Sequence, residues 1–130
     1  MPAKLESRLP QISKQVHQAL ASTTKRAAED TTRRLHLAMD DQKHGRIYGA
    51  HQASAPGEPP ASESGKLEGS IKVEPQGDTD HVVYSDDPKA EWLELGTDHI
   101  EPRPMWGPVS EIVRSELPQI AREEFEKRVK

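Results

Sequence analysis

Residues 87–108 read DPKAEWLELGTDHIEPRPMWGP and contain both tryptophans of a chain whose aromatic content is only 4%. Asp87 followed by Pro88 has the form of an N-cap and a first-turn proline. Gly96 suits the left-handed residue that ends a helix. The stretch therefore predicts a short capped helix over residues 89–95, around which we expect the remaining elements to be arranged.

The segment after this helix is stiffened by Pro102 and Pro104, which fix φ and withhold two backbone donors. They also keep Glu101 and Arg103 extended, because a residue before proline avoids the helical region. We expect a rigid strap that presents its side chains instead of joining a sheet interior. Pro108 then suits the first turn of a further helix.

Each tryptophan has two interpretations, a core residue or an anchor in a protein–protein interface. Trp92 would share one face of the short helix with Leu95, and we favour packing in the core for it. Trp106 belongs to the proline-stiffened strap, so we favour an interface role for it.

Residues 8–42 have the pattern of one long helix, which Ser7 can cap and whose first turn tolerates Pro10. At about 1.5 Å per residue it would span roughly 48 Å, which is longer than a domain of this size needs. Two packings remain open, either on the sheet of its own chain or partly on a neighbouring subunit. The apolar stripe recurs at intervals of three and four and consists of Leu9, Ile12, Val16, Leu20, Thr23, Ala27, Leu35 and Met39.

Residues 46–64 are rich in proline and glycine and predict a long loop without regular structure. Loops of this length inside compact domains are usually functional or disordered. Ser64, at the end of the loop, can cap a single helical turn over residues 66–68.

Residues 70–74 alternate apolar and polar side chains, which predicts a half-buried strand with Ile71 and Val73 facing inward. Pro75 would open a turn, and residues 81–85 would supply the return strand. A lone hairpin is barely stable, so we expect helices across one face and further strands beside it.

Residues 110–129 predict a C-terminal helix that Pro118 should kink or interrupt. We expect residues 1–130 to form a single domain, in which residues 65–130 carry the sheet and this last helix.

The composition indicates a modest core. Leu, Ile, Val and Phe make up just under a fifth of the chain, near the level at which chains struggle to order themselves. Burying surface in an assembly would add stability.

The absence of cysteine excludes disulfides and thiolate metal sites. No apolar run approaches the roughly 20 residues of a membrane span and no signal-peptide core is evident, so we expect a soluble protein made in the cytoplasm, without a membrane partner.

Charge is unevenly placed along a chain whose net charge is -4. Residues 1–60 carry nine basic and six acidic groups, whereas residues 61–130 carry nine basic and sixteen acidic groups. Between Glu74 and Glu101 nine carboxylates stand against the single Lys89, and a face with that balance would repel a phosphate backbone.

Three features suggest chemistry or nucleic-acid binding. His99 with Asp98 and Glu101 is the nearest approach to a metal cluster, although solvated loop residues are favoured. If the three side chains do hold a metal, the alternative function is a small metal-dependent hydrolase. Glu91 and Glu94 could form a carboxylate pair for acid–base work. A basic run on the long helix could contact DNA, although a solvated helix face is favoured; it comprises Lys25, Arg26, Arg33 and Arg34.

Several runs together resemble a family signature. EWLELGT at residues 91–97 and RPMWGPV at residues 103–109 are similar to the LE-x-GT and RP-x-x-x-P pattern of siphophage head–tail junction proteins, which are called neck, head–tail joining or tail-completion proteins. Upstream, GRIYGAHQASAPGEPPASESGKLEGSIKVE resembles the proline-rich loop and TG-x-L-x-x-SI element of the same family. The resemblance covers most of residues 45–109.

The resemblance implies an α+β fold with a long N-terminal helix, a small antiparallel sheet, a short helix and a C-terminal helix. It implies a non-enzymatic virion protein without a cofactor, assembled in the host cytoplasm as a ring around the DNA channel. Its partners would be copies of itself and adjoining neck, tail-terminator or tail-tube proteins, while DNA passes through the lumen without specific binding. The loop over residues 46–64 would order against a neighbour, and a plain connector is the alternative.

By the same resemblance, Glu94 is structural and accepts hydrogen bonds from the backbone or from Arg103. The expected interface residues fall in two groups. The short helix and strap contribute Trp92, Leu93, Glu94, Gly96, Thr97, Pro102, Arg103, Pro104, Met105, Trp106 and Pro108, and the loop contributes Pro56, Gly57, Pro59 and Pro60.

Overall fold

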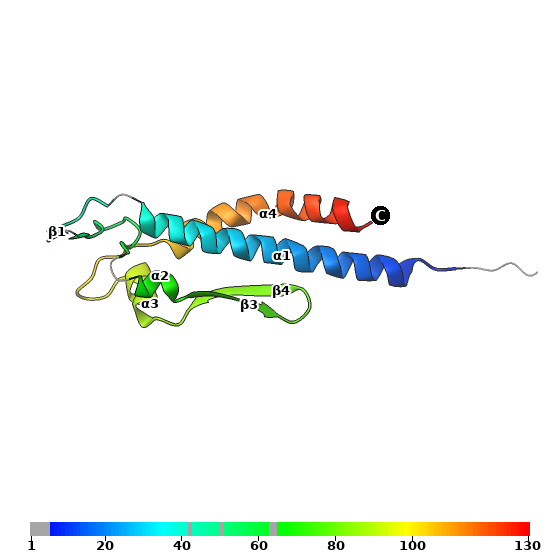
Figure 1. Ribbon diagram of the computed structural model, residues 1–130, viewed down its shortest axis with the longest axis horizontal. Helices are drawn as coiled ribbons and strands as arrows, with labels where there is room; N and C mark the ends of the chain where they lie inside the picture. Colours follow the sequence, from blue (N-terminus) through cyan, green and yellow to red (C-terminus); the bar gives the residue numbers. More distant parts are fainter. Residues whose placement is uncertain (1–5, 42, 50, 63–64) are drawn as a thin grey trace, which may run out of the picture.

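The computed structural model describes residues 6–41, 43–49, 51–62 and 65–130, and it has the expected α+β architecture. The long helix α1 lies between the helix α4 on one side and the β3–β4 hairpin on the other (Figure 1). In chain order the elements are α1 (Leu9–Asp40), β1 (Ile47–Tyr48), β2 (His51–Gln52), α2 (Lys66–Gly69), β3 (Ile71–Gln76), β4 (Asp80–Ser85), α3 (Pro88–Leu95) and α4 (Trp106–Arg128).

The core lies at the C-terminal half of α1. Leu35 and Met39 from this helix pack with Met105, the N-cap of α4, and with Val109 and Val113 in the first turns of that helix. The hairpin and α2 close the other side through partly buried apolar residues, namely Leu67, Ile71 and Val83. The predicted stripe on α1 is therefore buried chiefly within its own chain, except that Leu9 and Leu20 near its N-terminal end are exposed.

Ion pairs join α1 to α4 alongside this core. Arg26 Nη1 lies 2.8 Å from Glu123 Oε2 and 3.3 Å from Glu124 Oε1. Arg34 contacts Glu116 in the same way. Two cations of the basic run thus form ion pairs with carboxylates from the acidic half of the same chain. The uneven charge distribution therefore helps to hold α1 against α4.

The β3–β4 hairpin is longer than predicted, because β3 continues through Pro75, which pairs with His81. The expectation that Pro75 opens the turn is wrong. Proline is tolerated there because β3 is an edge strand, whose outward N–H groups need no partner. The turn follows at Gly77, whose φ is 70°. Val73 was expected to face inward but is 37% exposed, because α1 packs chiefly on β4.

The loop over residues 46–64 is not devoid of regular structure, which corrects that prediction. Ile47 pairs with Gln52, and Tyr48 with His51, in a separate two-stranded sheet. Gly49, with φ of 61°, provides the turn between them. Strands of only two residues show no apolar periodicity from which they could have been predicted.

Two further helical expectations have different outcomes. The turn over 66–68 is present as α2, but its N-cap position is Gly65, and Ser64 lies outside the described residues. The helix α4 has Pro108 in its first turn as predicted. Of the two outcomes predicted at Pro118, a kink or an interruption, the interruption is wrong, because the helix is continuous across this residue. Pro118 is exposed, which lets water solvate the carbonyl that loses its N–H partner.

Candidate interaction site

The short helix α3 is capped as the sequence predicts. Asp87 Oδ1 accepts a hydrogen bond from the Lys89 backbone at 3.0 Å, and Pro88 is the first helical residue. Gly96 ends the helix with φ of 79° and donates to the Trp92 carbonyl at 2.8 Å. A Cβ at Gly96 would lie 2.9 Å from the Pro102 ring, so this position requires glycine for space as well as for conformation.

Glu94 connects α3 to α4 by capping the start of the longer helix. Its Oε1 accepts hydrogen bonds from the backbone of Met105 and Trp106, each at 2.8 Å. Its Oε2 accepts one from the backbone of Gly107 at 2.9 Å. One carboxylate thus satisfies donors that a helix start leaves unpaired, and its charge opposes the positive end of the helix dipole.

Glu94 accepts from the backbone, which is one of the two expected alternatives, whereas the other candidate, Arg103, has different partners. Its guanidinium donates instead to the carbonyls of Ser54 at 3.3 Å and Glu101 at 3.0 Å. Its backbone N–H donates to the Leu93 carbonyl at 2.6 Å, which folds the strap back onto α3.

The strap also binds the proline-rich loop. The backbone of Gly57 donates to the Pro102 carbonyl at 3.0 Å. Inside the loop, Glu58 Oε1 accepts from the backbone of Ala55 and His44, each at 3.0 Å. Within the strap, Thr97 Oγ1 accepts from the Ile100 backbone at 3.1 Å. The loop and strap therefore hold each other in place within one chain.

The two tryptophans are placed differently from the expectation. Trp92 is 47% exposed, so its assignment to the core is wrong. Trp106 packs against the core cluster while part of its indole remains accessible. Its Nε1 is buried and has no hydrogen-bond partner among the described residues. An interface role for Trp106 stays a prediction.

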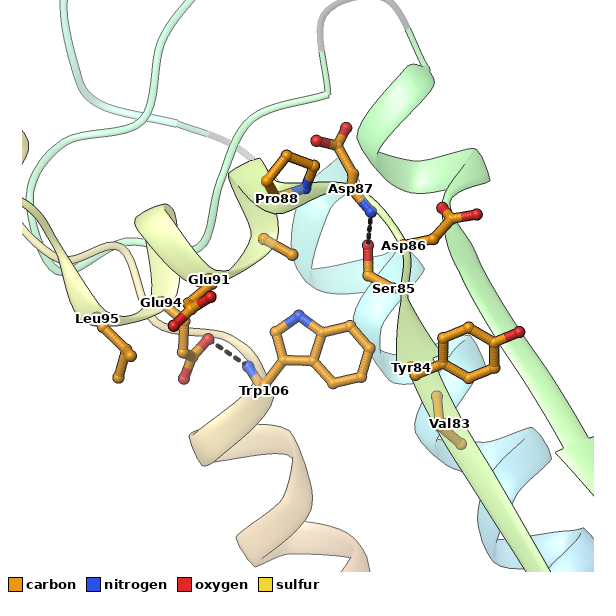
Figure 2. A pocket seen from close by; sticks show the side chains of 11 residues that line it. Val83, Tyr84, Ser85, Asp86, Asp87, Pro88, Glu91, Glu94, Leu95 and Trp106 are labelled. Carbon is orange, nitrogen blue, oxygen red and sulfur yellow. Dashed lines mark hydrogen bonds between the residues drawn. The ribbon is translucent and has the colours of Figure 1, made fainter. Parts of the chain in front are cut away.

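A pocket of about 500 Å³ lies between β4, α3 and the start of α4, and we call it the α3 pocket (Figure 2). The indole of Trp106 lies between α3 and β4 in this view, with Pro88 above it and Val83 below. Asp86 and Glu91 supply carboxylates to the lining. The pocket thus combines an apolar surface with negative charge.

The carboxylates around the α3 pocket differ in their engagement. Lys72 Nζ lies 2.5 Å from Asp86 Oδ2, and this hydrogen bond lowers the pKa of Asp86. Glu94 is occupied by the start of α4. Glu91 is exposed and makes no hydrogen bond or ion pair with any residue in the described ranges. Glu91 is therefore the carboxylate available to an incoming cation.

A second hollow of about 510 Å³, the α1–α4 groove, lies where the proline-rich loop meets the two long helices. Exposed Leu37 and Ile112 stand on its walls. Of the predicted interface residues, this groove brings together Gly57, Pro59, Pro104, Met105 and Pro108. Pro56 is exposed on the loop and Pro60 is buried, and neither lines the groove.

Sequence reasoning missed the first strand of the β1–β2 hairpin. Ile47 and Tyr48 of β1, with Arg46 just before them, form what we call the tip. Ile47 is 67% and Tyr48 58% exposed. The Arg46 guanidinium lies 5.9 Å from the centre of the Tyr48 ring. The hairpin lies at one end of the molecule (Figure 1). The available signal was an apolar pair just before a glycine inside a polar loop.

The described residues include no group of three or more His, Asp or Glu side chains placed to hold a metal ion. His99, Asp98 and Glu101 are each exposed on the strap side of the molecule and are not brought together as a metal site. In the part of the chain that the structure describes, no helix has the length and apolar character to cross a membrane.

No family model, curated protein or solved structure matches this chain.

Proposed function

We propose that this chain is a structural virion protein of a tailed phage, a neck or tail-completion component that joins head and tail around the DNA channel. The observation that carries the proposal is the convergence of the residues behind the family resemblance. Glu94 caps α4, Gly96 lies against Pro102, and Arg103 joins the strap to the loop. The residues of this signature contact one another and join α3, the strap and the start of α4. We therefore expect the same local structure in other proteins that carry the signature.

The exposed apolar surface supports a role in assembly. Trp92 and Leu95 project from α3, while Leu37 and Ile112 flank the α1–α4 groove. Apolar patches of this kind on a small domain are typical of surfaces that bind other proteins. A chain with so modest a core gains stability when partners cover such patches.

The loop and strap act in this proposal as one preformed surface. Because Gly57 and Arg103 already tie them together, little conformational entropy is lost when an adjoining ring binds. The acidic stretch from Glu74 to Glu101 would edge the channel and repel the DNA backbone, so that DNA slides past without binding.

The experiment is sedimentation of the purified full chain, alone and with the products of the neighbouring genes. We expect self-association into a ring, or a stable complex with a neck or tail protein encoded nearby. A chain that stays monomeric at high concentration and binds none of these products would overturn the proposal.

A further inference from the structure

We propose that the tip of one copy, Arg46, Ile47 and Tyr48, docks into the α3 pocket of the next copy. This contact would repeat around the ring, so the inference rests on the proposed function and names the surfaces that carry it. The contact joins two different patches and is therefore head-to-tail, the arrangement that closes into a ring when the rotation between copies permits.

The tip has the properties of an inserted element. Ile47 and Tyr48 expose most of their side chains at the end of a hairpin whose strands are only two residues each. A hairpin this short is barely stable in water by itself, so burial of its side chains against a partner would stabilise it. Arg46 contacts only the Tyr48 ring among the described side chains. Its charge remains available for a partner.

The α3 pocket has the complementary properties. Its volume of about 500 Å³ lies inside the ~300–1,000 Å³ range of pockets that enclose drug-sized groups, which is enough room for an aromatic and an aliphatic side chain. Trp106, Val83 and Pro88 supply an apolar surface. The buried indole N–H of Trp106 lacks an acceptor among the described residues, and a small repacking around it would let a backbone carbonyl of the entering hairpin serve as one.

The charges of the tip and of the α3 pocket favour docking of the tip into the pocket over a contact between two tips. The pocket rim is negative, and Glu91 has no partner among the described residues. The tip offers a guanidinium directly beside its two apolar side chains. Arginine beside apolar residues matches a carboxylate at the edge of an apolar pocket, and such pairs fix register as well as partner choice. A tip-to-tip contact would instead bring two copies of Arg46 together.

The first test measures self-association of the full chain by sedimentation velocity. Arg46→Glu and Glu91→Arg should each weaken it about tenfold or more, and the double variant should restore it, because the swapped charges attract again. Arg122→Glu and Glu126→Arg are matched controls, since both residues are exposed on α4 and have no described partner. Neither control should change self-association.

The second test uses the absence of cysteine in the chain, which makes introduced thiols unambiguous. A mixture of the Ile47→Cys and Leu95→Cys proteins should form a disulfide between copies under mild oxidation, because Leu95 stands on the pocket wall. The double variant should give a ladder of larger species. Ile47→Cys mixed with Arg122→Cys should give no cross-link above background.

The outcomes separate this inference from the proposed function. If the wild-type chain assembles but the reversals behave like their controls and no cross-link forms, the docking is wrong and the proposed function stands. If the tip thiol cross-links to a neighbouring gene product instead of to Leu95→Cys, the tip serves a different partner and the docking is equally wrong. If the chain neither self-associates nor binds any neighbour, both proposals fall.

Discussion

Glu94 Oε1 lies 2.8 Å from the backbone nitrogen of Trp106, so a side chain near the end of α3 caps the beginning of α4. The same carboxylate also reaches Met105 and Gly107. Met105 is a fully buried core residue. The contact therefore fixes the two helices relative to each other at the point where the second one enters the core.

Replacing Glu94 should destabilise the fold. Glu94→Ala leaves the donors of Met105, Trp106 and Gly107 without their acceptor, at a cost of about 2–3 kcal/mol. Glu94→Gln keeps the shape but loses the charge and places an amide N–H against a backbone donor, at a cost of about 1–2 kcal/mol. Urea unfolding of the full chain measures both.

The control for this prediction is Glu126→Ala, at an exposed position of α4. This substitution should change the free energy of unfolding by no more than about 0.5 kcal/mol. A Glu94→Ala variant as stable as this control would mean that the capping contact adds nothing to stability.

Replacing Trp92 should change the free energy of unfolding little, whereas replacing Trp106 should lower it substantially. Trp92→Ala removes an exposed side chain and should change the free energy of unfolding by no more than about 0.5 kcal/mol, while weakening binding to any partner found in the test of the proposed function. Trp106→Ala removes packing against the core and should cost about 2–4 kcal/mol. Trp106→Phe should cost less than about 1.5 kcal/mol, because the indole N–H has no described partner to lose.

Urea unfolding and partner binding, measured on the same three variants, decide this prediction. A large loss of stability in Trp92→Ala, or a Trp106→Phe variant as unstable as Trp106→Ala, would contradict the placement of the two indoles.

Local signals in the sequence were sufficient for the ends of α3. Asp87 and Gly96 contact residues two and four positions away along the chain, so their roles follow from cap and φ preferences alone. The acceptor role of Glu94 followed only from the resemblance, because its partners begin eleven residues later. Its donors could not be read from the sequence, because they reach Glu94 only when the strap folds back and brings the start of α4 against α3.

Contacts between distant segments could not be predicted. The burial of each tryptophan depends on which face α3 turns toward α4. An eight-residue helix is too short for its apolar pattern to specify that face. The engagement of Arg26 by Glu123 joins residues 97 positions apart. The basic run suggested a DNA contact, although two of its four cations, Arg26 and Arg34, meet carboxylates on the neighbouring helix α4.

Gly96 should tolerate no side chain. With φ of 79° and an added Cβ only 2.9 Å from the Pro102 ring, Gly96→Ala should cost more than about 2 kcal/mol. Gly69→Ala is the matched control, because this glycine has negative φ and open space around it. The control should be neutral or stabilising by about 0.5–1 kcal/mol. Equal thermal midpoints for the two variants would contradict the tight contact between Gly96 and the strap.

Glu124 should make stability depend on acid pH. Its carboxylate is only 3% exposed, and burial alone would raise its pKa, but Lys127, Arg26 and Arg128 outweigh burial and hold the pKa below the ordinary 4.5. A lowered pKa in the folded chain means that ionised Glu124 stabilises the fold. That contribution is complete above the ordinary pKa and is lost as the pH falls through the lowered value.

The measurement is urea unfolding of the wild-type chain and of Glu124→Gln at several values between about pH 7 and about pH 3. The wild type should be more stable near neutrality, and the difference should shrink on acidification, because protonated Glu124 resembles glutamine. Glu126→Gln, on the exposed face of the same helix, should show a small difference that changes little with pH. A difference between wild type and Glu124→Gln that stays constant or grows in acid would mean that the three cations do not stabilise the charged carboxylate.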